Sequence, residues 1–121
     1  MVKNGTLARR LAFAWLGIRF AFARERSFRT QSFLGLGALG ALALLRPPVL
    51  WWALCLLSGG AVLAAELINT ALEQLLDRLH PEQHDSIRVA KDCAAAAVLC
   101  LSIAAALVGV AMVLVSFGVL L

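Results

Sequence analysis

The sequence predicts an all-α integral membrane protein, in which an N-terminal amphipathic surface helix precedes three transmembrane helices. Hydrophobic residues make up 62% of the 121 residues, whereas soluble domains contain about 45–50% apolar residues. The mean hydropathy is +0.89. Charged side chains are absent from residues 30–45, 47–65 and 93–121. Because a helix needs about 20 apolar residues to cross the hydrocarbon core of a bilayer, these stretches predict three crossings.

Residues 1–29 are expected to lie along the membrane surface. Apolar side chains recur there at helical spacing, including Leu7, Leu11 and Trp15, and arginines occupy other positions around the helix. This pattern is typical of a helix at the interface between lipid and water. Arg19 interrupts the apolar stretch and no small-residue cleavage site follows, so a secretory signal is not indicated.

The three crossings are expected at residues 30–46, 47–77 and 91–121. The second helix is expected to extend into the cytosol, before a cytoplasmic loop at residues 78–90. The Pro47–Pro48 pair separates the first two helices, because proline cannot continue a helix interior. Small residues spaced four apart allow the helices to approach closely. Three helices leave little interior for polar side chains, so a homo-oligomer is expected.

The basic residues predict how the chain is oriented in the membrane. Seven of the eleven lie before Thr30, one lies between the first two crossings, and three lie between the last two. The positive-inside rule therefore places the N-terminus and the second loop in the cytoplasm. The net charge of +4 is interpreted as favouring attraction to lipid headgroups and not binding of nucleic acid. The cysteines lack metal-ligand spacing and are interpreted as packing residues: Cys55, Cys93 and Cys100.

A polar stripe marks the end of the second crossing. Glu66, Asn69, Glu73 and Asp77 fall within about 80° of each other on a helix. Residues 47–65 rise about 28 Å, nearly the thickness of the hydrocarbon core, so Glu66 is expected near the membrane boundary. A solvated helix end is the alternative interpretation, and it is favoured for Asp77 taken singly. It is not favoured for Glu66 and Glu73 together, because they share one face with Asn69.

Charged residues from two other helices are expected at the same level, with Glu25 before the first crossing and Lys91 and Asp92 before the third. Carboxylates with an amide oxygen suit Mg²⁺, and a lysine suits a phosphate. A desolvated carboxylate suits a general base for a hydroxyl group. Together these side chains predict phosphoryl transfer at a membrane surface. The sequence has no Walker A loop and no kinase-type glycine-rich strand.

The segment ELINTALE (residues 66–73), followed by Asp77 and by Ala90-Lys91-Asp92, resembles the prokaryotic integral-membrane diacylglycerol kinase family. Upstream, ERSFR (residues 25–29) resembles the segment at the end of the family's surface helix. The resemblance covers nearly the whole chain. It implies a homotrimer with active sites shared between subunits, in the bacterial cytoplasmic (inner) membrane, with ATP as co-substrate.

The resemblance also implies roles for individual residues. Glu66 takes the proton from the lipid hydroxyl, Asn69 orients Glu66 or the phosphate, and Lys91 neutralises the transferring phosphoryl group. Glu25 and Glu73 hold Mg²⁺. The implied ATP contacts are Arg9, Glu25, Glu73, Asp77, Glu82, His84, Lys91 and Asp92, and the implied lipid contacts are Glu66, Phe28, Arg29 and Ala95. The chain departs from the family near its start, where Thr6 and Phe13 replace a common arginine and an aromatic hydroxyl, so that Arg9 is a candidate only.

Three functions are compatible with these residues. The first is phosphorylation of diacylglycerol to phosphatidic acid, and the second is the same chemistry on undecaprenol. The motifs lie on the phosphate side of the reaction, so they do not choose between the two lipids. The third is a non-enzymatic oligomer that conducts protons or ions through Glu66. Glu25 and Lys91 argue against conduction, because conduction does not require a group of side chains that suits a metal ion and a phosphate.

Overall fold

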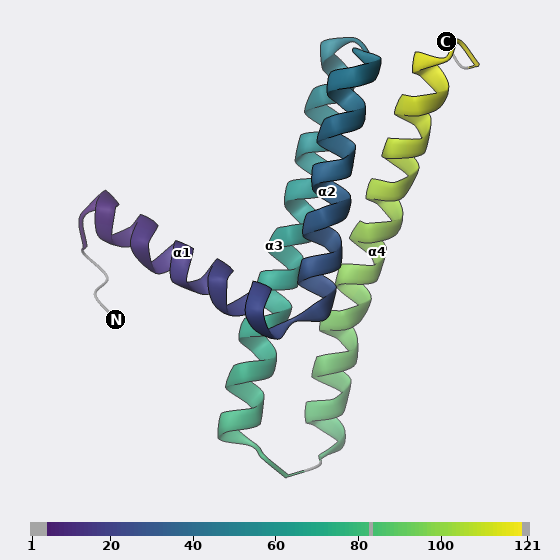
Figure 1. The fold of residues 1–121 in the computed structure, drawn as a ribbon. Coiled ribbons are helices and arrows are strands. Elements are labelled where there is room, and N and C mark those ends of the chain that lie inside the picture. The colour runs from purple at the N-terminus through teal and green to yellow at the C-terminus, as the bar shows by residue number, and fades with distance from the viewer. Residues whose placement is uncertain (1–4, 83, 120–121) are drawn as a thin grey trace.

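The computed structural model describes residues 5–82 and 84–119, and these residues form four α-helices. The helices are α1 (Leu7–Arg24), α2 (Arg26–Leu45), α3 (Val49–Leu79) and α4 (Asp85–Ser116). In Figure 1, α2, α3 and α4 lie roughly along a common axis, with α3 running opposite to α2 and α4, whereas α1 leaves them at a steep angle. The predicted all-helical fold is confirmed for the described part of the chain.

Three of the described helices, α2, α3 and α4, are long and apolar enough to cross a membrane. The number of predicted crossings is therefore confirmed by length and composition. The helix α1 is exposed along most of its length, with only Ala21 buried. Its position on a membrane surface stays a prediction, as do the membrane boundaries at residues 30–46, 47–77 and 91–121.

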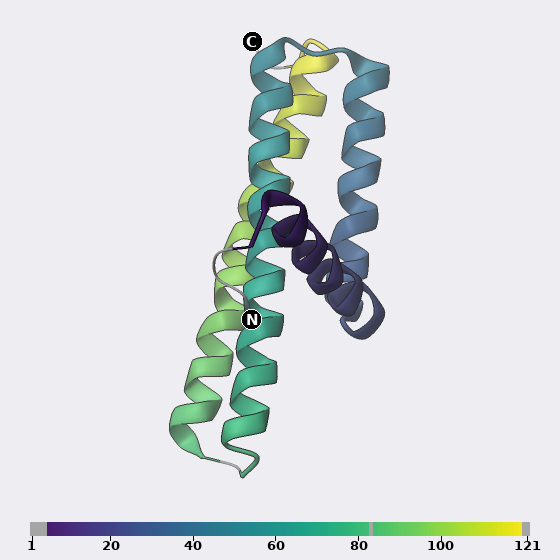
Figure 2. The same ribbon diagram turned by 90° about the vertical axis from the view of Figure 1, so that its left-hand side faces the viewer.

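The helices α3 and α4 are longer than α2, with 31 and 32 residues against 20. They pack against each other more extensively than any other pair of described helices. Figures 1 and 2 show that both extend together past the junction of α1 and α2. We call this two-helix projection, residues 73–82 and 84–92, the stalk.

A single residue, Glu25, separates α1 from α2 and has an extended backbone conformation. We call the junction the elbow. Arg29 fixes it, because its Nη1 donates hydrogen bonds to the backbone oxygens of Phe22 (2.8 Å) and Ala23 (3.2 Å). The last carbonyls of a helix have no partner within the helix, and a basic side chain satisfies them well. The guanidinium group of Arg29 therefore joins the first turn of α2 to the last turn of α1.

Two helices begin earlier than the expected segments. The helix α2 begins at Arg26, before the crossing expected from residue 30, and α4 begins at Asp85, before the crossing expected from residue 91. Residues 85–90, the last part of the expected loop, are thus helical. His84 caps α4, because its side chain accepts a hydrogen bond from the backbone nitrogen of Ser86 at 3.1 Å. An acidic residue in the first turn also favours this start. Lys91 therefore lies in the second turn of α4.

The single chain has a small interior. Its buried described residues are Ala21, Phe28, Leu42, Pro47, Val62, Glu66, Thr70 and Met112. Three of them, Val62, Glu66 and Thr70, follow each other at intervals of four on α3, so they form one face of that helix. Contacts from both α1 and α2 reach α3. A carboxylate is therefore enclosed in the small core.

Candidate functional site

Glu66 lies next to the elbow, and the residue is only 2% exposed. Its Oε1 accepts a hydrogen bond from Ser27 Oγ of α2 at 2.5 Å. The neighbouring hydroxyl of Thr70 donates instead to the backbone oxygen of Glu66, at 2.9 Å. Phe28, also buried, follows Ser27 in the chain. We call these four residues the elbow site.

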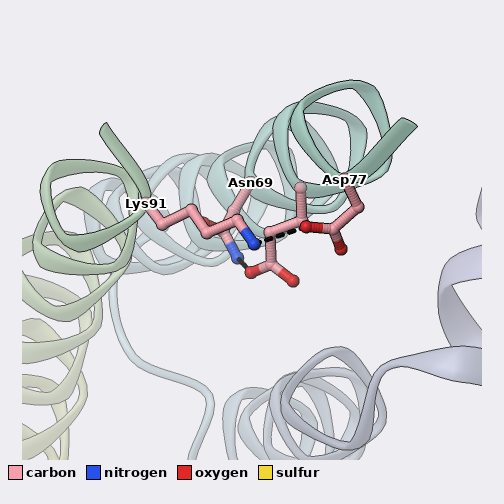
Figure 3. Close-up of polar contacts among 4 residues, drawn as sticks. Asn69, Asp77 and Lys91 are labelled. Atoms are coloured by element: carbon pink, nitrogen blue, oxygen red, sulfur yellow. Dashed lines mark hydrogen bonds and ion pairs between the residues drawn. The ribbon is translucent and has the colours of Figure 1, made fainter. Parts of the chain in front are cut away.

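A second polar group begins one turn further along α3. Asn69 Nδ2 donates to Glu73 Oε1 at 2.7 Å, and Lys91 Nζ forms an ion pair with Asp77 Oδ1. In Figure 3, Lys91 reaches across from α4 toward the face of α3 that carries Asn69 and Asp77. Lys91 of α4 therefore joins the predicted stripe at Asp77.

The end of the stalk surrounds a hollow of about 270 Å³. Five of the eight predicted ATP contacts line it: Asp77, Glu82, His84, Lys91 and Asp92. The rim is polar and open, since the side chains of Asp77 and Lys91 are 61% and 37% exposed. The fold thus brings residues from α3, α4 and their connection to one place. Their role in binding ATP stays a prediction.

Other predicted residues lie elsewhere in the single chain. Glu25 lies in the elbow, and Arg29 is engaged with the end of α1. Arg9 lies in the first turn of α1, at the end that points away from the other helices (Figure 1). Ala95 is exposed, one turn beyond Lys91 on α4. Their contacts with ATP or lipid stay predictions.

The predicted metal ligands are not gathered into a closed cluster. Within residues 5–82 and 84–119, no group of three or more His, Cys, Asp or Glu side chains is placed to hold a metal ion. The donors nevertheless suit Mg²⁺, which usually binds one or two carboxylates together with substrate phosphates and water. Glu73 supplies one carboxylate. Beside it, Asn69 Oδ1 is a buried oxygen without a hydrogen-bond partner among the described residues, so a further acceptor is available.

An apolar cavity of about 680 Å³ lies between α2, α3 and α4. Val62, one turn before Glu66 on the same face of α3, is part of its lining. Gln31 Nε2 donates to Ser102 Oγ at 2.8 Å across the cavity wall, joining α2 to α4. The cavity therefore approaches the elbow site from the side of the apolar spans.

Ser27, Thr70 and the Gln31–Ser102 pair were not predicted as part of any site. Ser27 stands 39 residues from Glu66 in the sequence, and no spacing rule connects residues so far apart. The only signal available for Thr70 was its position four residues after Glu66, which places it on the same helix face. A hydroxyl next to a predicted base is thus found only through the packing of α2 on α3.

The fold and these side chains define a class of protein: a multi-pass membrane protein with carboxylate, amide and lysine groups gathered toward one end of its spans. The sequence profile described as prokaryotic diacylglycerol kinase matches residues 12–113. The chain belongs to the prokaryotic diacylglycerol kinase family. The resemblance carried by ELINTALE and Ala90-Lys91-Asp92 is therefore confirmed.

Individual relatives agree with this assignment. The diacylglycerol kinase of Synechocystis sp. (strain ATCC 27184 / PCC 6803 / Kazusa) is 41% identical over 98 residues, which cover 80% of this chain and 56% of that relative. The diacylglycerol kinase of Escherichia coli (strain K12) is 32% identical over 87 residues, covering 72% and 71%. The undecaprenol kinase of Bacillus subtilis (strain 168) is 28% identical over 85 residues, covering 70% and 69%. The chain thus spans little more than half the length of its Synechocystis relative.

Proposed function

We propose that this chain is an ATP-dependent lipid kinase, which transfers the γ-phosphate of ATP to diacylglycerol and forms phosphatidic acid. The observation that supports this most is the order of groups on α3. Glu66 is enclosed beside an apolar cavity, and the Asn69–Glu73 pair begins one turn further toward the open stalk. A base for a lipid hydroxyl and groups for a nucleotide thus share one helix. Relatives named diacylglycerol kinase support this acceptor, and one named undecaprenol kinase keeps the second lipid as the alternative.

Glu66 is proposed as the general base. The lipid lies with its apolar tail along the cavity next to Val62, so that its hydroxyl reaches the elbow site. The carboxylate takes the hydroxyl proton as the oxygen attacks the γ-phosphorus, and the bond to the leaving ADP oxygen breaks. Burial of Glu66 keeps water away from this position, which limits hydrolysis of ATP in place of transfer.

The stalk is proposed to hold ATP. Lys91 exchanges its ion pair with Asp77 for the phosphates, where a positive charge offsets charge on the transferring group. Asn69 orients the reacting groups, and Glu82, His84 and Asp92 line the hollow that takes the rest of the nucleotide. Mg²⁺, held by Glu73 and Glu25, supplies further charge neutralisation when it is bound.

A homotrimer with shared sites is part of the proposal. Glu25 and Arg9 are predicted to serve the same nucleotide as Glu73, yet among the described residues no hydrogen bond or ion pair joins either of them to the stalk. A site completed by the elbow and α1 of another subunit accounts for this separation. The proposed setting is the bacterial inner membrane with the N-terminus in the cytoplasm, as the basic residues predict.

The test is a transfer assay with purified protein and ATP labelled on the γ-phosphate, offering diacylglycerol and undecaprenol in parallel vesicles. We expect labelled phosphatidic acid, and none from the Glu66→Gln protein. If the label appears only in undecaprenyl phosphate, the lipid acceptor is undecaprenol instead of diacylglycerol, and the proposed phosphoryl transfer stands. Protein that is folded and oligomeric but labels neither lipid would overturn the proposal.

A further inference from the structure

We propose that Ser27 is a positioning residue for Glu66: its hydroxyl holds Oε1 of the carboxylate and leaves Oε2 to accept the proton of the lipid alcohol. This inference rests on the proposed function of Glu66 as the base. It concerns which of the two oxygens does the chemistry, and what keeps that oxygen in place.

The contact joins two helices that are far apart in the sequence. Ser27 lies in the first turn of α2, next to the elbow, and Glu66 lies near the middle of α3. Ser27 Oγ donates to Oε1 at 2.5 Å. The serine is itself an exposed residue, whereas Glu66 is almost fully enclosed. The hydroxyl therefore meets the carboxylate from the outer side of the core.

The two carboxylate oxygens differ in their surroundings. Among the described residues, Ser27 is the donor to Oε1, and Oε2 accepts no hydrogen bond. Thr70, the other buried polar residue, donates to the backbone of Glu66 and not to its side chain. The one fully buried side-chain oxygen without a hydrogen-bond partner among the described residues belongs to Asn69 and not to Glu66. Oε1 is therefore the oxygen that Ser27 engages, and Oε2 is the one that we assign to the alcohol.

Holding one oxygen also holds the other. The terminal torsion of a glutamate is broad and roughly two-fold, so a carboxylate without a fixed partner rotates through many orientations. A misplacement of about 1 Å at a reacting group can lower a rate by about 10²-fold. Ser27 removes that freedom without entering the reaction. Its own proton stays on Oγ, and only the proton of the lipid alcohol moves, to Oε2.

The decisive experiment compares Ser27→Thr with Ser27→Val, because these side chains have nearly the same shape and differ in the hydroxyl. We expect Ser27→Thr to keep kcat close to the wild-type value, and Ser27→Val and Ser27→Ala to lower kcat by about tenfold or more. The KM for ATP is expected to stay unchanged in all three, since the nucleotide groups lie on the stalk. Ser116→Ala is the control, because the Ser116 hydroxyl donates to the Met112 backbone oxygen within its own helix, at 2.8 Å.

A second comparison separates positioning from a general effect on the fold. In a Glu66→Gln background, removing the Ser27 hydroxyl is expected to add no further loss, because the group that it positions no longer accepts a proton. Equal kcat in Ser27→Thr and Ser27→Val, or an additive loss in the double variant, would overturn the role of Ser27. If the wild-type protein is active in the same assay, the proposed lipid kinase function still stands. A wild-type protein without transfer activity would overturn both.

Discussion

The elbow site and the stalk lie on the same helix, yet they place charge in opposite surroundings. At the elbow, Glu66 is 2% exposed and its carboxylate has one hydroxyl partner. On the stalk, Asp77 and Lys91 pair across two helices with much of both side chains open to the surroundings. An enclosed charge depends strongly on each neighbouring group, whereas exposed charges are weakened by solvent and salt. In the proposed function, the enclosed part of α3 serves the chemistry and the open part exchanges a charged ligand.

The largest effect is expected from Glu66→Gln. The amide keeps the shape of the side chain but cannot take the hydroxyl proton, and removal of a general base usually lowers a rate by about 10²–10⁴-fold. Thermal stability is expected to be equal or greater, because a buried charge is lost. Lipid phosphorylation and thermal unfolding in detergent measure the two effects. Near-normal phosphorylation would show that Glu66 is not the base, and failure to assemble would show that it holds helices together.

A loss of about 10- to 100-fold in activity or in apparent affinity for Mg²⁺ is expected for Glu73→Gln, because a carboxylate that serves the metal becomes an amide. Glu25→Gln is expected to behave in the same way if the elbow of one subunit meets the stalk of another. Rates measured across a Mg²⁺ titration check both. The metal assignment is wrong if both variants keep the wild-type rate and the wild-type dependence on Mg²⁺.

Lys91→Met tests the open part of the comparison. It keeps the apolar stem and removes the charge, so we expect the KM for ATP to rise about tenfold, with or without a lower kcat, in line with the loss of a charged hydrogen bond. The oligomer is expected to stay intact. Arg78→Met, a change of the same kind in the last turn of α3, is the control. Dissociation of the Lys91→Met protein in detergent would identify the lysine as structural.

The smallest effect is expected from the Arg88–Asp92 ion pair. The two side chains lie one turn apart on α4 at 3.2 Å and are 60% and 67% exposed. Such pairs contribute about 0.3–0.5 kcal/mol, because solvent screens them. Arg88→Gln is therefore expected to change the unfolding free energy by no more than this, as measured by denaturation in detergent. A loss of unfolding free energy several times larger would mean that this ion pair is less exposed to solvent than proposed, and the contrast between stalk and elbow would be wrong.

Much of the fold could be predicted from local pattern. The three long apolar stretches and the Pro47–Pro48 break located the helices α2, α3 and α4, because length and proline chemistry act over a few residues. The helix α4 begins at Asp85, six residues before the crossing expected from residue 91, because His84 caps it. Local rules thus located the elements, whereas the membrane boundaries stay predictions.

The candidate site could be predicted only in part. The shared face of Glu66, Asn69, Glu73 and Asp77 follows from the helical period, and the charges before the third crossing drew attention to Lys91. Which groups meet was not predictable, since the contacts of Ser27 with Glu66 and of Lys91 with Asp77 depend on how helices pack. Those contacts cross between elements, where the helical period gives no guidance.

The position of the elbow has a consequence for the order in which the chain comes apart. The helices α2 and α3 form a helical hairpin whose turn is Arg46-Pro47-Pro48, and Ser27 and Glu66 meet near its open end, 39 residues apart. Closing a longer loop costs more chain entropy, and structure frays first where local stability is lowest. We expect the hairpin to zip from its proline turn during folding and to open first at the elbow. The reactive carboxylate is then the last part of the hairpin to be enclosed and the first to be released.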